Sequence, residues 1–120
     1  MKCNWKKLAA EAVNTLSSDE RAKSIVYLEQ RIIPAREYVP WSGIAQSFDE
    51  PVVIAFADLE PALNWTHAGR YLILNTDGGI RATLDVNRPP YLTQVSPDLR
   101  LIHRGNEAPE WAVITTATVE

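Results

Sequence analysis

Three side chains that could support acid–base chemistry follow one another within a short stretch of the sequence: Asp58, His67 and Arg70. A histidine can accept or donate a proton near neutral pH, and a nearby carboxylate can orient its ring. An arginine can hold an anion through two parallel hydrogen bonds. The stretch therefore suggests a site in which Asp58 and His67 move protons while Arg70 holds a carboxylate or a phosphate.

Other side chains could complete such a site or serve a different one. Asn64 and Trp65 lie in the same stretch and could contact a ligand or a partner. Glu29 falls within an apolar stripe, where a carboxylate needs a polar partner, so it could meet His67 or Arg70. The alternatives are structural: Glu29 extends to the edge of the stripe or makes a simple ion pair, Asp58 caps a short helical turn, and the loop is held by its own hydrogen bonds.

No motif identifies a class of enzyme. The sequence has no serine or cysteine in a nucleophile elbow and no glycine-rich phosphate loop. The spacing of Asp58, Glu60 and His67 matches no usual metal site, so we expect neither a metal nor a cofactor. Whether the chain is an enzyme stays open, and the missing motifs favour the view that it is not.

The candidate site should lie at the end of a central strand. Residues Val52 to Ala57 form a continuous apolar run rich in β-branched side chains, a pattern typical of a strand buried on both faces. Asp58 follows directly. A carboxylate in that position would be held rigidly beside a loop, which is where binding and catalytic residues concentrate.

Two helices are predicted before this strand. The first has apolar residues three and four apart along one face: Trp5, Leu8, Ala9, Ala12, Val13 and Leu16. Ser17 and Glu20 then have the spacing of a capping box, which predicts a second helix over residues 18–33, ended by Pro34. The short connection predicts an antiparallel helical hairpin.

Four further strands are predicted after the candidate site. Residues 70–76 and 80–86 should form a hairpin, and a three-residue turn at 77–79 is preferred because it places Leu72 and Leu74 on one face with Ile80, Ala82 and Leu84. A two-residue turn would pair Ile73 with Leu84. Residues 99–103 and 111–119 are expected to be strands, and residues 91–95 are expected to form a short extended piece.

These elements predict an α+β fold: a single domain, residues 1–120, in which an N-terminal helical hairpin packs on a mainly antiparallel sheet of four or five strands. The connector at residues 34–50 should pack Tyr38, Trp41 and Phe48 against the core, although these aromatic side chains could equally form a recognition surface.

Composition excludes some classes of function. The 12 basic and 15 acidic side chains give a net charge of -3 and form no basic stripe, so nucleic-acid binding is disfavoured. No apolar run reaches the ~20 residues of a membrane span. Cys3 is the single cysteine, and no signal peptide is recognisable, so we expect a cytoplasmic protein.

Two functions remain. The first is a protein-interaction module, such as an adaptor, an inhibitor or an immunity-type protein, because the chain has four tryptophans, a residue type enriched at binding hot spots. Its surface would draw on a set of aromatic and arginine side chains: Trp41, Trp65, Arg70, Tyr91 and Trp111. The second is a small-molecule binder or acid–base enzyme that uses Asp58, His67 and Arg70. The sequence leaves the partner and the oligomeric state unknown.

Overall fold

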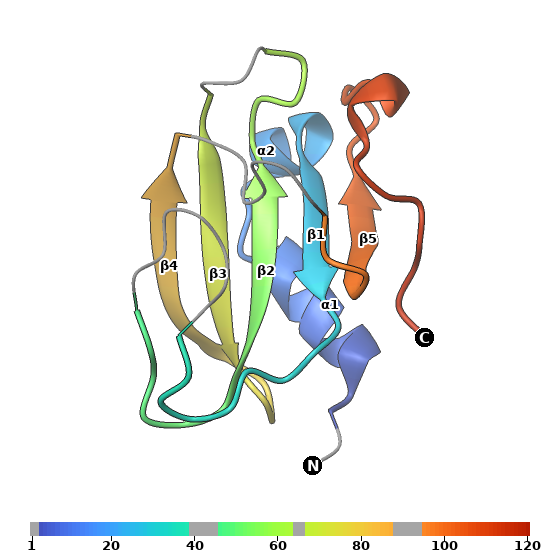
Figure 1. Cartoon of the computed structure of the whole chain (residues 1–120). Coiled ribbons are helices and arrows are strands. Elements are labelled where there is room, and N and C mark those ends of the chain that lie inside the picture. Colours follow the sequence, from blue (N-terminus) through green and yellow to red (C-terminus); the bar gives the residue numbers. More distant parts are fainter. Residues whose placement is uncertain (1–2, 39–45, 64–66, 88–94) are drawn as a thin grey trace.

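Five antiparallel strands form one open sheet in the order β4-β3-β2-β1-β5 (Figure 1). The computed structural model describes residues 3–38, 46–63, 67–87 and 95–120. The strands are β1 (Ile25–Glu29), β2 (Val52–Asp58), β3 (Gly69–Asn75), β4 (Ile80–Val86) and β5 (Leu99–Arg104). The helices are α1 (Trp5–Asn14), α2 (Ser18–Lys23) and the short 3-10 helix η1 (Glu110–Ala112). The sheet and the N-terminal helices give an α+β fold.

The apolar run before Asp58 is the central strand, as predicted. All seven residues of β2 are buried, and β2 pairs with β1 on one side and with β3 on the other. Its side chains alternate between two clusters of buried residues. On the face that α1 covers, here the helix face, the cluster contains Leu8, Ala12, Leu28, Val53, Ala55, Leu72 and Leu74. On the opposite face, here the loop face, it contains Ile25, Tyr27, Ile33, Val52, Ile54, Phe56, Tyr71, Ile73, Leu99 and Ala108.

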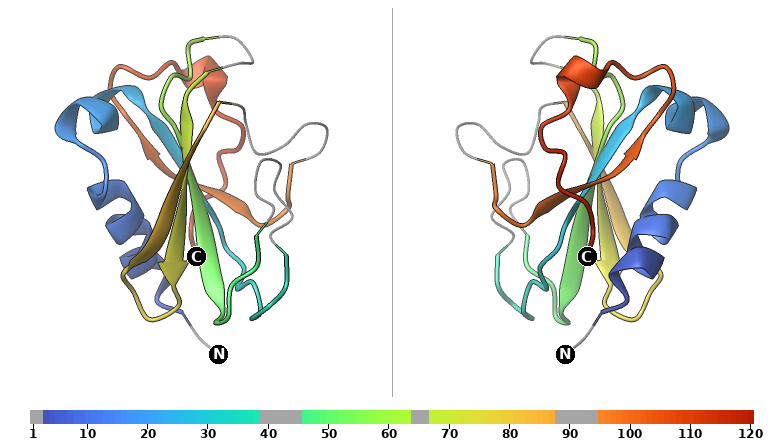
Figure 2. Two further views of the ribbon diagram at one scale, coloured as in Figure 1. Left: turned by 90° about the vertical axis from the view of Figure 1, so that its left-hand side faces the viewer. Right: turned by 90° about the vertical axis from the view of Figure 1, so that its right-hand side faces the viewer.

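The first helix lies against one side of the sheet, as the two views in Figure 2 show. It is attached to the turn between β3 and β4 by two polar contacts: Lys7 Nζ donates to the carbonyl of Asp77 (2.9 Å), and Glu11 Oε2 accepts from the amide of Gly79 (2.8 Å). Gly78 and Gly79 have φ angles of 117° and 90°, which glycine adopts without strain. The turn therefore both connects two strands and holds the helix.

The second helix is much shorter than the sequence suggested. The capping box at Ser17 and Glu20 is present, but α2 ends at Lys23 and the chain continues as β1. Because β1 lies between β2 and β5, hydrogen bonding along both of its edges and burial of every side chain favour a strand over a helix. The helical hairpin is thus one ten-residue helix followed by a six-residue one.

The preferred hairpin register was wrong. Tyr71 pairs with Leu84 and Ile73 pairs with Ala82, so Ala82 and Leu84 pack on the loop face. Ile80 pairs instead with Leu74, which belongs to the helix face. A bulge between Ile73 and Leu74 leaves Arg81 without a partner residue on β3. Both faces of β3 are buried, and an apolar partner can therefore fit either face. Continuity of one apolar face could not select the register.

The predicted strand at residues 111–119 is also absent. The segment begins with η1 and then follows the sheet without a regular ladder. Two single hydrogen bonds attach it, from the amide of Ile114 to Tyr27 Oη (2.9 Å) and from the amide of Leu101 to the carbonyl of Ala117 (2.6 Å). A high β propensity alone was not sufficient to form a strand here.

The connector after β1 has a mixed outcome. Phe48 packs against the cluster on the loop face, as expected, whereas Tyr38 is 68% exposed. Trp41 lies outside the described residues. Within the part of the chain that is described, no helix is long and apolar enough to span a membrane.

The close approach of Gly105 to α2 gives a stability test. A Cβ at this position would collide with the backbone carbonyl oxygens of Arg21 and Ala22, which cannot move away independently. We expect Gly105→Ala to reduce the free energy of unfolding by about 3 kcal/mol, measured by urea denaturation. The neighbouring exposed Asn106→Ala should change it by less than about 0.5 kcal/mol. Equal effects of the two substitutions would contradict this account.

Candidate functional site

The structure brings Asp58 and His67 together at the end of β2. His67 Nε2 lies 2.8 Å from Asp58 Oδ1, within hydrogen-bonding distance. The side chain of His67 is only 10% exposed and that of Asp58 only 13%, so the contact is largely shielded from solvent. The contact forms because β2 and β3 are antiparallel, so the loop between them begins and ends at the same edge of the sheet. Asp58 at the end of β2 pairs there with Gly69 at the start of β3.

The base of this loop is held by a network around the same carboxylate. Asp58 Oδ1 also accepts from the amide of Glu60 (3.2 Å), and Glu60 Oε1 in turn accepts from the amide of Ala68 (2.7 Å). A backbone hydrogen bond from Leu59 to Ala68 (3.2 Å) joins the two sides directly. The base of the loop is therefore held by its own hydrogen bonds, and the Asp58–His67 contact is present as well.

Burial controls the protonation of two groups in this region. It raises the pKa of Asp58, and the adjacent His67 offsets only part of that effect. Tyr27 lies on the same face of the sheet and is fully buried; burial raises its pKa to about 12, while the amide of Ile114, which donates to the phenol oxygen, acts in the opposite direction. Tyr27 is consequently neutral across the physiological range and serves as a hydrogen-bond acceptor.

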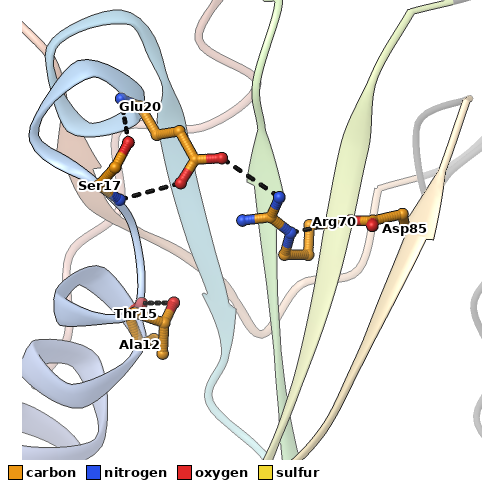
Figure 3. Close-up of polar contacts among 6 residues, drawn as sticks. All are labelled: Ala12, Thr15, Ser17, Glu20, Arg70 and Asp85. Atoms are coloured by element: carbon orange, nitrogen blue, oxygen red, sulfur yellow. Dashed lines mark hydrogen bonds and ion pairs between the residues drawn. The ribbon is translucent and has the colours of Figure 1, made fainter.

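Arg70 lies on the other side of the sheet. Its guanidinium contacts Glu20 Oε2 through Nη2 (3.2 Å) and Asp85 Oδ1 through Nε (2.8 Å), which links α2, β3 and β4 (Figure 3). The hydrogen bond to Asp85 is the main reason that the pKa of Arg70 is raised. Arg70 pairs with Ala57, one residue before Asp58, so the side chains of Arg70 and Asp58 lie on opposite faces. The expected group of acid, base and anion clamp is not assembled.

Glu29 does not join the pair either. It is 2% exposed and ends β1, whereas the partner of Asp58 in the ladder is Ile25 at the beginning of that strand. Four residues of extended chain separate the two positions by about 13 Å. The predicted approach of Glu29 to the loop depended on a helical period that this segment does not have.

Several predicted site residues lie outside the described residues. These are Asn64, Trp65 and Trp41, together with Tyr91 of the proposed interaction surface. Trp111 is described, and its side chain is 75% exposed. The second histidine, His103, has its Nε2 2.6 Å from the carbonyl oxygen of Arg21 and is remote in sequence from the loop.

A groove of about 290 Å³ lies beside the loop. One wall comes from the loop itself and the other from the segment that follows β5, and the lining residues are Lys23, Leu59, Glu60, Pro61, Ala62, Leu63, Glu107 and Pro109. Leu63 is 55% exposed. Sequence reasoning did not find this groove, because Lys23, Glu107 and Pro109 come from distant segments and no local pattern connects them.

A larger open groove, of about 560 Å³, lies between α1 and the C-terminal segment. Its lining is mainly apolar and comprises Lys6, Ala9, Ala10, Val13, Asn14, Leu101, Ile102, Thr118 and Val119. Among the described residues, no cluster of three or more histidine, cysteine, aspartate or glutamate side chains could hold a metal ion.

A scan against protein-family models, a search of curated proteins and a search of solved structures each found no match for this chain.

The network around Glu20 gives a test of how the charge of this side chain stabilises the fold. The hydrogen bond from the Ser17 amide, assisted by Arg70, lowers the pKa of Glu20 in the folded protein. The stabilisation is therefore complete above the unfolded-state pKa, near 4.5, and is lost as the pH falls through the folded-state pKa. Because the side chain is partly exposed, we expect Glu20→Gln to reduce the free energy of unfolding by about 0.5 kcal/mol at pH 7.

The difference between Glu20→Gln and the wild type should shrink at pH 3, as measured by urea denaturation at both pH values. Asp19→Asn is the matched control, because Asp19 occupies the same first turn and is exposed. A deficit of the same size at pH 7 and pH 3 would show that Glu20 does not act through its charge.

Proposed function

We propose that this chain is a protein-interaction module that binds a segment of a partner protein in the groove between residues 59–63 and 107–109. The observation that carries the proposal is the exposure of two large apolar side chains at this end of the molecule. Leu63 lines the groove, and Trp111 follows Pro109, another lining residue, by two positions. Exposed apolar surface next to a concavity is typical of protein-binding sites.

The walls of the groove are held in place before any partner binds. The amide of Glu107 donates to the carbonyl of Ala22 (2.9 Å), and the amide of Gly105 donates to the carbonyl of Ser24 (2.9 Å). The opposite wall contains a turn closed by a hydrogen bond from the amide of Leu63 to the carbonyl of Glu60 (3.0 Å). A preformed groove supports binding, since little conformational entropy has to be lost on association.

The charges at the groove indicate the kind of partner. Glu60 and Glu107 line it, and Glu110 lies beside Trp111, whereas Lys23 is the single basic residue among the described residues of the lining. A partner segment with apolar anchor residues and a neighbouring lysine or arginine would complement this surface. Such a cation could also contact the face of the Trp111 ring.

The test is co-purification of a partner from the native host, read by mass spectrometry, with matched variants of this chain. Leu63→Ser and Trp111→Ser should each weaken binding of a stoichiometric partner by roughly 30-fold, the loss of a typical hot-spot side chain. Tyr38→Ser is the control, because it removes an equally exposed aromatic side chain from a different segment. Partner binding that survives both groove substitutions would refute the proposal.

A second function, binding of a small molecule with acid–base chemistry, is supported by the Asp58–His67 distance of 2.8 Å. Against it, Arg70 is on the opposite face, and neither Asp58 nor His67 lines the adjacent groove. If this function holds, some member of a panel of small carboxylates and phosphates should raise the melting temperature of the wild type by about 4 °C or more, but not that of His67→Gln. Equal shifts in both proteins, or none, would exclude it.

A further inference from the structure

One carboxylate oxygen connects the two sides of the loop that forms the groove. Asp58 Oδ1 accepts a hydrogen bond from the amide of Glu60 on the outgoing side and contacts His67 Nε2 on the returning side. The Glu60 side chain then reaches back to the amide of Ala68. The Leu59–Leu63 wall of the groove is thereby attached to Asp58 through the Glu60 amide.

The strength of the contact at this point depends on protons. Histidine is the side chain that ordinarily changes charge between pH 5 and 8. A neutral and a protonated imidazole can both donate an N–H to an ionised carboxylate, but only the protonated ring adds the attraction between opposite charges. When the imidazole is neutral, the attraction between opposite charges is lost. Shielding from solvent increases the difference between the two states.

We propose that the Asp58–His67 contact is a proton-operated latch for the groove: protonation of His67 tightens the base of the loop and holds Leu59–Leu63 in the arrangement described here. Binding of the partner would then be stronger at mildly acidic pH than at alkaline pH. The consequence for the partner rests on the proposed function, whereas the latch itself can be measured in the free protein.

Other titratable groups lie near the latch. Tyr27 on β1 stays neutral, and Glu60 within the loop repels the Asp58 charge. Lys23 and Glu107 lie across the groove. Because burial raises the pKa of Asp58, this carboxylate takes up a proton at a higher pH than an exposed one, which ends the charged contact on the acidic side. The charged contact therefore does not keep strengthening towards low pH, because it is lost once Asp58 is protonated.

The test is amide hydrogen exchange of the full chain, followed by NMR at pH 6 and pH 8 and expressed as protection factors, which remove the intrinsic effect of pH on exchange. The amides of Glu60 and Ala68 report on the two sides of the latch. In the wild type, we expect their protection to be several-fold, up to about tenfold, higher at pH 6 than at pH 8.

Two variants remove the titration and keep a hydrogen-bonding group. His67→Gln and Asp58→Asn should each give protection factors that are the same at both pH values. His103→Gln is the matched control, because it removes the other histidine of the chain and should leave the pH dependence of Glu60 and Ala68 unchanged. Wild-type protection that does not change with pH, or a change that persists in His67→Gln, would overturn the latch.

The proposed partner site can fail separately. Leu63→Ser removes a groove side chain and leaves the latch residues intact, so it should weaken partner binding by the roughly 30-fold given above while the pH dependence of protection remains. If the latch is present and no partner binds at the groove, the latch stands and the proposed function falls.

Discussion

The fold depends on one constraint, the burial of β2 on both of its faces. Its odd-numbered and even-numbered positions supply side chains to two separate apolar clusters, and burial of each large side chain contributes about 1.5–3 kcal/mol. A strand buried in this way needs hydrogen-bonding partners along both edges, because an unpaired backbone amide is costly away from water. The neighbours β1 and β3 satisfy that need, and the covering helix and loops follow from it.

The same alternation of side chains separates the polar residues that follow β2. The side chain of Asp58 lies on the loop face and contacts His67. Arg70 pairs with Ala57, so its side chain lies on the helix face and contacts Glu20. One sheet thus carries two unrelated polar networks back to back. The network on the helix face attaches α2 to the strands, and the network on the loop face closes the loop that forms one wall of the groove.

Residues far apart in the sequence form the groove, and they do so because antiparallel strands bring their connections to the same end of the sheet. The loop after β2 and the segment after β5 both line the groove together with Lys23 at the end of α2. The amides of Glu107 and Gly105 donate to the carbonyls of Ala22 in α2 and of Ser24, the residue that follows it. Hydrophobic side chains at this end, Leu63 and Trp111, have no cover within the described part of the chain. The proposed binding of a partner segment would cover these side chains, whereas chemistry at the shielded Asp58–His67 pair would leave them exposed.

Local patterns in the sequence predicted the central strand, the first helix and the capping box at Ser17, because each depends on residues that are neighbours in the chain. They also suggested that Asp58 and His67 could meet, because a short loop joins the two residues. They could not show that the residues after Lys23 form β1, since helix and strand suit Ile25–Leu28 equally until β2 and β5 supply hydrogen bonds on both sides. Nor could they place Arg70 and Asp58 on opposite faces or assemble the groove. Those features were decided by the tertiary structure, because strand order, register and the bulge at Ile73 depend on contacts between distant segments.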